Sequence, residues 1–579
     1  MHASGRVAAA AFALLPGALT VYLSFNAGGF FVAAPALAAV VVAAALVLRT
    51  MLARRPFEGI GPSVAVVAGG LALLAIWTLA SAWWSDAPAR SLIEFDRVLL
   101  YTLVVVACAA APRSLPRLRL VAGGVALALI AVCVAGLVTR LAPDVWSIPL
   151  NVEEDRLSYP LTYWNALGLM AAFGILLCVH GSASERESRA VRVVSAAALP
   201  ALGVTLLLTF SRGAIAACAL GAVAYLVLAR PRGLLGALVA AGPAVYAVLE
   251  GYHADLLATP RYTEMAGIEQ GHHVATVVAL ACLAAGLLRA AMDPLDRRVA
   301  RIAPPGVVGR RVAMGVATVA VIAAAGTAVA LGAPGYVDRQ AQSFVDGSEV
   351  AADNGDRRER LTDAGNNGRI DLWKASLDAY RADPGVGSGA GTFQITWARE
   401  RKLVFEVNDG HSLYVEVLGE LGLVGAGLLL LALGGLLVAA GLAVRGRERH
   451  LQAAIFAILL AWAARAGIDW DWELPAVTLP VLALGAAAVA RPGGWGRIGG
   501  APRQVTRLVV GLAWLVLAVT PGLVALSQHH LGRSLDAYRA GDCPEAIVTV
   551  RRSRGFNSRA RAASALGASP AAPRTSESP

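Results

Sequence analysis

The sequence predicts an all-α fold: a polytopic membrane helical bundle of about 14–15 spanning helices, with one large extracytoplasmic loop that carries an amphipathic helix. Composition is the first reason. Of the 579 residues, 57% are hydrophobic and only 15% are charged, whereas soluble domains carry about a quarter charged residues. The second reason is that apolar runs of bilayer length recur along the chain, with clusters of arginine between them.

The apolar runs provide roughly the 17–25 residues that a spanning helix needs, and one is longer, as expected of a tilted helix. No compelling small-residue cleavage site follows the first run, so we interpret it as a retained span. The runs lie at about 8–25, 30–48, 62–83, 92–111, 118–138, 162–179, 193–210, 214–229, 233–250, 273–291, 312–332, 412–443, 452–468, 474–490 and 508–526.

The arginine clusters all fall on one side of the membrane if the N-terminus is cytoplasmic, which is the charge bias of cytoplasmic loops. The formal net charge of +11 does not indicate nucleic-acid binding, because the basic residues lie in short clusters between apolar runs. Representative clusters are Arg54 and Arg55, Arg113 to Arg119, Arg186 to Arg192, Arg230 and Arg232, Arg297 to Arg311, Arg445 to Arg449, and Arg491 to Arg507.

The stretch "TFSRGA" predicts a tight turn near the outer surface. Arg192 and Arg230 should both be cytoplasmic, so the apolar segment between them must cross the membrane an even number of times. Its polar break is at Ser211, Arg212 and Gly213. Glycine suits such a turn because it tolerates positive φ.

Four parts follow from these patterns. Residues 1–332 form an N-terminal membrane bundle, 333–411 the large extracytoplasmic loop, 412–526 the C-terminal membrane helices, and 527–579 an extracytoplasmic tail. The tail is expected to begin as a helical pair that turns at Gly541-Asp542 and to end in a disordered low-complexity stretch.

The second half of the large loop, "GRIDLWKASLDAYRADP", has apolar residues at helical spacing, at Ile370, Trp373, Leu377 and Tyr380. Pro384 should end this helix. An amphipathic helix here would lie on the membrane face of the protein or pack against the bundle.

Two arginines are candidate catalytic residues. Arg212 is near hydrocarbon depth, where charged side chains are costly and are functional candidates; the alternative is an interfacial arginine that extends to the headgroups. Arg369 opens the amphipathic helix after the Gly365–Gly368 stretch. The alternative interpretation of Arg369 is a solvated charge on the protein surface.

The glycine-rich stretch "PGVGSGAGTF" lacks the GxGxxG spacing and the βαβ context of a dinucleotide site. Successive backbone N–H groups around Gly387 and Gly389 would suit an anion nest for phosphate, so both residues are candidates for substrate binding. The alternative is a flexible connector.

The segment "FEVNDGHSLYVEVLGELGLVG" leads from a polar turn into an apolar helix. We expect Asp409 to cap this helix and His411, in its first turn, to be kept neutral by the helix dipole. A neutral imidazole can act as a general base; the alternative is a structural histidine. Glu416, a substrate-binding candidate, shares a helix face with Glu420, and both should pair with arginines from neighbouring loops.

The segment "RAGIDWDWELPA" combines carboxylates with tryptophans, a combination that suits a sugar. Asp469 is therefore a substrate-binding candidate, while Trp470 is interpreted as part of the aromatic belt at the membrane interface. The six cysteines are scattered singly, so neither a metal site nor a disulfide framework is expected.

Five segments, in this order, resemble the O-antigen ligase and polymerase superfamily of bacterial membrane glycosyltransferases. They are "YPLTYWNALGLMAA", which contains the substrate-binding candidate Asn165, then "TFSRGAIAA", "GRIDLWKASLDAYRADPGVGSGAGTF", "DGHSLYVEVLGELGLVG" and "GIDWDWELPA". The resemblance covers roughly residues 60–490. The chain has more apparent spans than the usual dozen and an additional tail, which leaves the choice between ligase and polymerase open.

The resemblance implies a metal-independent glycosyltransferase, without a cofactor, in the bacterial inner (cytoplasmic) membrane, with its active site extracytoplasmic. Its partners would be an undecaprenyl-diphosphate-linked glycan donor, a glycan or lipid-glycan acceptor and membrane lipid, but no nucleic acid. Arg212 and Arg369 would bind the diphosphate, and His411 would act on the acceptor hydroxyl. The alternatives are a transporter or flippase of lipid-linked glycan, for which we see no convincing internal repeat, and a peptidoglycan-type glycan polymerase.

Overall fold

The computed structural model describes residues 3–148, 156–302, 342, 344–345, 356–361, 365–401, 406–446, 448–492 and 503–565. Over these residues the chain forms helices and no strand, which confirms the predicted all-α bundle. Ten helices in the described part are long and apolar enough to cross a membrane. The predicted span at 312–332 lies outside the described residues.

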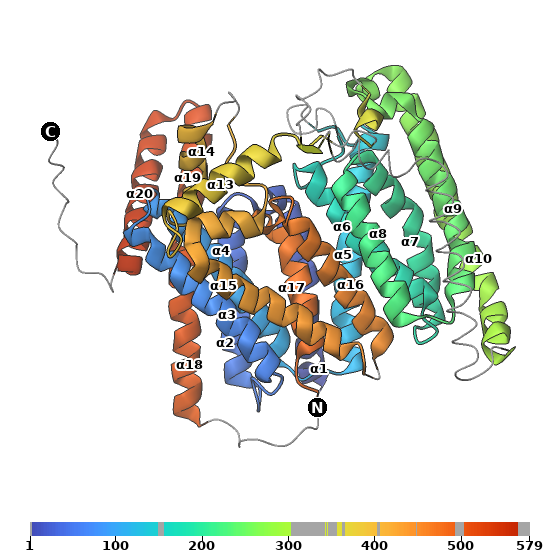
Figure 1. The fold of residues 1–579 in the computed structure, drawn as a ribbon, viewed down its shortest axis with the longest axis horizontal. Helices are drawn as coiled ribbons and strands as arrows, with labels where there is room; N and C mark the ends of the chain where they lie inside the picture. Colours follow the sequence, from blue (N-terminus) through green and yellow to red (C-terminus); the bar gives the residue numbers. More distant parts are fainter. Residues whose placement is uncertain are drawn as a thin grey trace.

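The bundle contains α1 (Ala3–Ser24), α2 (Ala33–Leu52), α3 (Pro62–Ala80), α4 (Pro88–Ala110), α5 (Leu115–Leu141), α6 (Trp164–Ala183), α7 (Arg189–Leu208), α8 (Arg212–Ala229), α9 (Leu234–His253), α10 (Met265–Ile302), α15 (Leu413–Ala443), α16 (Arg449–Ala466) and α17 (Pro475–Val489). Between α10 and α15 lie α13 (Arg369–Ala382) and α14 (Phe393–Glu400); α18 (Gln504–Leu517), α19 (Val519–Arg539) and α20 (Cys543–Ala565) follow α17. In Figure 1, α13 and α14 lie across one end of the bundle, and α1 begins at the other.

Ten is fewer than the 14–15 spanning helices expected, and the difference has physical causes. Two further apolar helices are shorter: Ala9–Ser24, and α17 with 15 residues. Helix α4 carries Glu94, Asp96 and Arg97 in its first half, which lowers its apolar character. The apolar runs in the sequence therefore locate these helices, but not all of the helices have the length and composition of an independent span.

Helices α6 and α17 lie at the centre of the bundle. Nearly nine-tenths of the apolar window of α6 is buried, and α17 packs against α1, α4, α15 and α16. Helix α17 is apolar on all sides, as is usual for a helix surrounded by protein. Because it begins at Pro475, directly after the "IDWDWE" segment, the core fixes the position of that segment.

The arginine-rich loops contact one another. Arg113 after α4 forms an ion pair with Glu448 after α15, at 3.5 Å between Nε and Oε2. Arg119 in α5 contacts Glu187 after α6 at 2.9 Å. Since α15 begins beside α13 and ends near Glu448, these loops lie at the end of the bundle opposite α13 (Figure 1). The loops that carry Arg113, Arg119 and Glu187 thus lie at the same end as Glu448, as the alternation of the clusters in the sequence predicts.

The longest predicted run does not form one uniform helix. Helix α15 is broken at Gly422, which has φ 62° and ψ −163°. The backbone N–H of Leu423 donates a hydrogen bond to the carbonyl oxygen of Pro384 at 2.9 Å, and Trp77 Nε1 donates to that of Leu421 at 3.1 Å. The segment after α13 therefore packs into the break.

The turn between α7 and α8 is present, but its residues differ from the prediction. Helix α7 ends at Leu208, and Arg212 already begins α8. The residue with positive φ is Phe210, at 46°. Gly213 is helical, and its importance is spatial: a Cβ atom there would lie 2.9 Å from Nε of Arg465.

The helical pair expected in the tail is also observed. Its first helix, α19, begins at Val519, before residue 527, where the tail was predicted to begin. Helices α19 and α20 pack against each other, with the turn at Gly541 (φ 79°). Buried serines join them: Ser527 Oγ donates to the Ser553 carbonyl oxygen at 3.0 Å.

Candidate active site

A cavity of about 530 Å³ lies between the start of α8, the start of α13, the end of α16 and the residues before α6 and α15. It brings together four residues singled out from the sequence: Asn165, Arg212, Arg369 and His411. Among the residues that the structure describes, no acidic side chain lines it. The lining side chains with polar groups are Arg156, Tyr163, Trp164, Asn165, Arg212, Arg360, Asn367, Arg369, His411 and Arg465.

Arg212 lines the cavity at the start of α8, and hydrogen bonds of the neighbouring Ser211 hold the α7–α8 turn in place. Ser211 caps α8 by accepting the N–H of Ala214, and its Oγ donates a hydrogen bond to Asn165 Oδ1 at 2.7 Å. Arg212 itself donates from Nη2 to the carbonyl oxygen of Gly365 at 3.2 Å. The side chain thus connects α8 to the segment that precedes α13.

Arg369 enters the cavity from the first position of α13. The preceding Gly368 has φ 78°, which turns the chain into the helix. Nη2 of Arg369 lies 3.5 Å from Asp469 Oδ2, and Nη1 donates to the Asn366 carbonyl oxygen at 3.4 Å. Its Nε is buried and has no hydrogen-bond partner among the residues that the structure describes. The guanidinium is therefore held at one edge, with a donor left for another acceptor.

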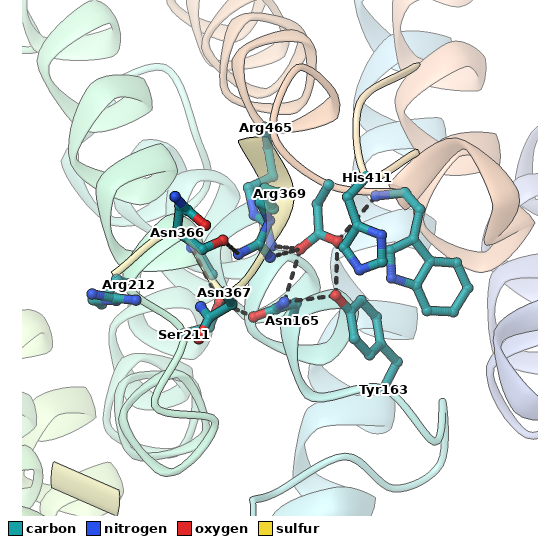
Figure 2. A network of polar contacts seen from close by, with 12 residues as sticks. Tyr163, Asn165, Ser211, Arg212, Asn366, Asn367, Arg369, His411 and Arg465 are labelled. Atoms are coloured by element: carbon teal, nitrogen blue, oxygen red, sulfur yellow. Dashed lines mark hydrogen bonds and ion pairs between the residues drawn. The ribbon is translucent and has the colours of Figure 1, made fainter. Parts of the chain in front are cut away.

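Asp469 lies behind the cavity wall rather than in the cavity. It is fully buried, and it accepts hydrogen bonds from Tyr163 Oη at 2.7 Å and Asn165 Nδ2 at 2.8 Å. It also pairs with Arg369 and Arg465. Figure 2 shows this network, with Arg212 and His411 on opposite sides of it. The expectation that Asp469 contacts a sugar is thus not supported: this carboxylate orients the residues that line the cavity.

The charge of Asp469 is secured by its neighbours. Burial alone would raise the pKa of this carboxyl, but the guanidinium groups of Arg465 and Arg369 outweigh burial and hold the pKa well below its usual range. The group is consequently ionised at neutral pH. It offsets part of the positive charge of the two arginines while leaving them in the cavity wall.

Three arginines of the cavity were missed in the sequence. Arg465 lies at the end of apolar helix α16, so the rule that identified Arg212 would have found it. Arg360 is one of several charges in a polar loop and carries no distinguishing signal. Arg156 stacks on Trp164, with its Cζ 4.6 Å from the ring centroid. Burial, and then the nearby charge of Arg360, lower the pKa of Arg156 to about 9. A bound anion would relieve this repulsion.

His411 lies before the helix rather than in its first turn. Ser412 is the N-cap residue of α15, and His411 has φ 51°. Asp409 does not cap the helix as expected: its Oδ1 lies 2.9 Å from His411 Nδ1, and it also accepts the His411 backbone N–H at 3.2 Å. The ring packs near Trp470, at 6.3 Å between centroids. With Nδ1–H donated to Asp409, Nε2 is the nitrogen available as a base.

The pKa of His411 also differs from the expectation of a ring kept neutral by a helix dipole. Burial disfavours the charged imidazolium, but the hydrogen bond and charge of Asp409 outweigh it, so the pKa is raised above its ordinary value. The cause is the position of the ring, which faces a carboxylate and not the helix terminus. Asp409 therefore stabilises the proton-bearing form of His411.

Glu416 and Glu420 use backbone amides, and not the expected arginines, as hydrogen-bond partners. Glu420 accepts the N–H groups of Gly391 at 2.9 Å and Phe393 at 2.8 Å. Glu416 accepts the N–H of Gly410 at 2.8 Å. Neither side chain lines the arginine-rich cavity. Both carboxyl groups fix the loops that flank α15.

Gly387 and Gly389 also lie outside that cavity. They have φ values of 71° and 100°, and the Gly389 N–H donates to the backbone carbonyl oxygen of Glu420 at 2.7 Å. A Cβ atom at Gly387 would lie 2.4 Å from the carbonyl carbon of Glu420, and one at Gly389 would lie 2.4 Å from the side chain of Ser85. The glycine stretch thus serves close packing, and its amides surround a glutamate of the protein itself.

Fold and cavity together define a class: a polytopic membrane protein with an arginine-lined cavity at one end of its helices. Within this class, residues 269–430 match the O-antigen ligase family model, which confirms the resemblance to the O-antigen ligase superfamily. The match includes Arg369 and His411 but ends before Asp469 and begins after Arg212. It indicates a membrane glycosyltransferase of the ligase or polymerase type, with lipid-linked glycan substrates. No curated protein matches the sequence.

Proposed function

We propose that the protein transfers a glycan from an undecaprenyl-diphosphate carrier to an acceptor hydroxyl, at the outer leaflet of the bacterial inner membrane, as a polysaccharide ligase or polymerase. The observation that carries the proposal is the cavity itself: within the described part of the chain, five arginines and one carboxylate-paired histidine line it, and no acidic side chain does. The arginine-rich loops at the opposite end fit the charge bias of the cytoplasmic side.

In this proposal the arginines bind the diphosphate. A guanidinium forms two-pronged, charge-assisted hydrogen bonds with phosphate oxygens, which a lysine ammonium cannot reproduce. Arg369 is the central residue, because its Nε lacks a partner within the described part of the chain and Asp469 pairs with its Nη2. Arg212 faces the same cavity from α8. As the bond between the sugar and the diphosphate breaks, the arginines offset the charge that develops on the leaving group.

His411 is the proposed general base. Its Nε2 takes the proton of the acceptor hydroxyl while the acceptor oxygen forms its bond to the anomeric carbon, and the diphosphate leaves with the electron pair of the broken bond. Asp409 holds the ring through Nδ1 and stabilises the imidazolium that forms. A positioned base typically contributes about 10²–10⁴-fold to the rate.

A transfer assay with matched arginine variants tests this function. The purified protein, in detergent, is given an undecaprenyl-diphosphate-linked glycan and a glycan acceptor, and the product is identified by mass spectrometry. We expect Arg369→Lys to lose most of the activity. Arg381→Lys should retain it, because Arg381 lies exposed on the same helix and pairs with Asp378.

Near-normal transfer by Arg369→Lys would contradict the proposed diphosphate contact. Transfer that requires a peptidoglycan precursor as donor would instead identify a peptidoglycan-type polymerase. Movement of the lipid-linked glycan across vesicles, without any new glycosidic bond, would identify a flippase.

A further inference from the structure

A second, smaller cavity is lined by Trp470, whose ring also packs near His411. It has a volume of about 40 Å³, and we call it the acidic chamber. Trp470 lines the chamber and also packs against His411 and Tyr163, which line the larger cavity. The chamber's polar lining consists of Thr78, Glu94, Glu416, Glu420 and Glu473, together with Trp470 and Trp472.

Among the described residues of this region, four carboxyl groups face a single guanidinium. Nη1 of Arg97 contacts both Glu94 and Glu473. Glu416 and Glu420 accept backbone N–H groups, which carry no full charge. The groups around Glu416 are therefore Glu420 on the same helix, Glu94 and Arg97 on α4, Glu473 on the segment before α17, and Asp409 on the preceding loop.

Several carboxylates that share a poorly solvated space cannot all remain ionised. One arginine balances only one of the four charges, so the remainder calls for protons or a bound cation. Among the described residues, no group of three or more His, Cys, Asp or Glu side chains is arranged to hold a metal ion. The geometry therefore favours protons.

Thr78 provides an independent indication that the chamber holds a ligand. Its side chain is 1% exposed, it lines the chamber, and its Oγ1 has no hydrogen-bond partner in the described parts of the chain. Other helical threonines, such as Thr20, Thr50 and Thr102, donate to the carbonyl oxygen four residues earlier. A buried hydroxyl without a partner is costly. The chamber exceeds the roughly 10–15 Å³ that a water molecule requires.

We propose that the acidic chamber is a binding site for protons and water: at neutral pH at least one of its four glutamic acids is protonated, and water bridges the carboxyl groups to Thr78. The chamber is also connected to His411, the proposed general base, because Glu416 accepts the N–H of Gly410, the residue before His411. Its proton content therefore changes the charge close to His411. This link to the base rests on the proposed function, whereas protonation of the chamber does not.

Infrared spectroscopy of the purified, full-length protein tests the chamber without an activity assay. A protonated carboxyl group has a C=O stretching band distinct from that of a carboxylate, and we expect this band at neutral pH. Glu416→Gln should reduce or shift the band, since glutamine keeps an oxygen acceptor for the Gly410 N–H. Glu264→Gln, at an exposed residue paired with Arg261, should leave the band unchanged.

Two further variants strengthen the assignment. Thr78→Val keeps the side-chain shape but removes the hydroxyl, and should shift the band by removing the water bridge. If the Glu416→Gln variant does not fold, Glu94→Gln is used in its place. Asp96 and Asp471 also have buried oxygens without partners, so the comparison is between variants and not with the absolute band.

Either of two results would overturn the proposal. The first is a carboxyl band that is unchanged in folded Glu416→Gln, Glu94→Gln and Thr78→Val. The second is a band that disappears at neutral pH when sodium or potassium is added, which would identify a cation site. Neither result changes the outcome of the transfer assay with Arg369→Lys, so the proposed function is tested independently of the chamber.

Discussion

The contact between Asp409 and His411 makes the pH dependence of transfer a test at the scale of single residues. A general base acts in its neutral form, and Asp409 raises the pKa of His411, so activity should be lost on the acid side as pH falls through this raised value. Asp409→Asn removes the largest raising contribution and leaves burial, which lowers the pKa. We expect the acid limb of the kcat/KM profile to move to lower pH.

Substitution of His411 itself separates catalysis from structure. His411→Gln can keep a hydrogen bond but cannot take a proton at neutral pH, so transfer should fall by about 10²-fold or more. The protein should still insert in the membrane and bind the lipid-linked donor. A fully active glutamine variant, measured in membranes at matched protein levels, would make His411 a structural residue.

Asp469 is expected to matter for stability as well as for activity. In Asp469→Asn, Arg369 and Arg465 lose a buried partner, and breaking such a pair costs about 3–5 kcal/mol. The folded-state pKa of Asp469 lies below its unfolded value, so its contribution is fully present above the unfolded pKa and is lost only as pH falls through the folded one. Thermal unfolding in detergent should show the same destabilisation at pH 6 and pH 8.

At the scale of helices, the break in α15 is the clearest case of a geometrical requirement. Alanine at Gly422 would have to adopt φ 62°, and its Cβ would lie 2.4 Å from the carbonyl oxygen of Gly385. With ψ −163° this backbone conformation is essentially restricted to glycine and costs another residue roughly 1–3 kcal/mol. Gly422→Ala should therefore lower the melting temperature and reduce transfer, since the segment after α13 packs into this break.

A second glycine of α15 serves as the matched control. Gly427 lies five residues further along, and nothing lies within 4 Å of the position that its Cβ would occupy. Gly427→Ala should leave both stability and transfer close to those of the unchanged protein. Equal effects of the two substitutions would show that the break is not needed.

The sequence predicted elements better than contacts. Hydrophobic runs and helical spacing located most helices, and the polar breaks located Arg212, Arg369 and His411, because these signals depend on residues close in the chain. The kink at Gly422, the positive φ of Phe210 and the burial of Asp469 depend on distant neighbours. Arg360 and Arg156 reach the cavity only through tertiary packing, so no local pattern distinguished them.

At the scale of the whole molecule, the proposed orientation in the membrane places α13 outside the cell and the arginine-rich loops in the cytoplasm. Lys374 is exposed on α13, and Ala190 is exposed at the start of α7, near the arginine-rich loops. In a background without native cysteines, including exposed Cys543, Lys374→Cys should react with a membrane-impermeant maleimide in intact cells. Ala190→Cys should react only after lysis. The reverse pattern would place the proposed site on the cytoplasmic side.

The surplus of arginine over acid in the cavity has a consequence for turnover. If the acceptor carries no diphosphate, the glycosylated product has none either, whereas the spent carrier retains the diphosphate that the five arginines of the cavity are proposed to bind. The carrier should therefore dissociate slowly and act as a product inhibitor that competes with the donor. Time courses should slow before the donor is consumed, and a phosphatase that shortens the diphosphate should restore the initial rate. Moderate salt should relieve the inhibition, because charge holds the carrier in place.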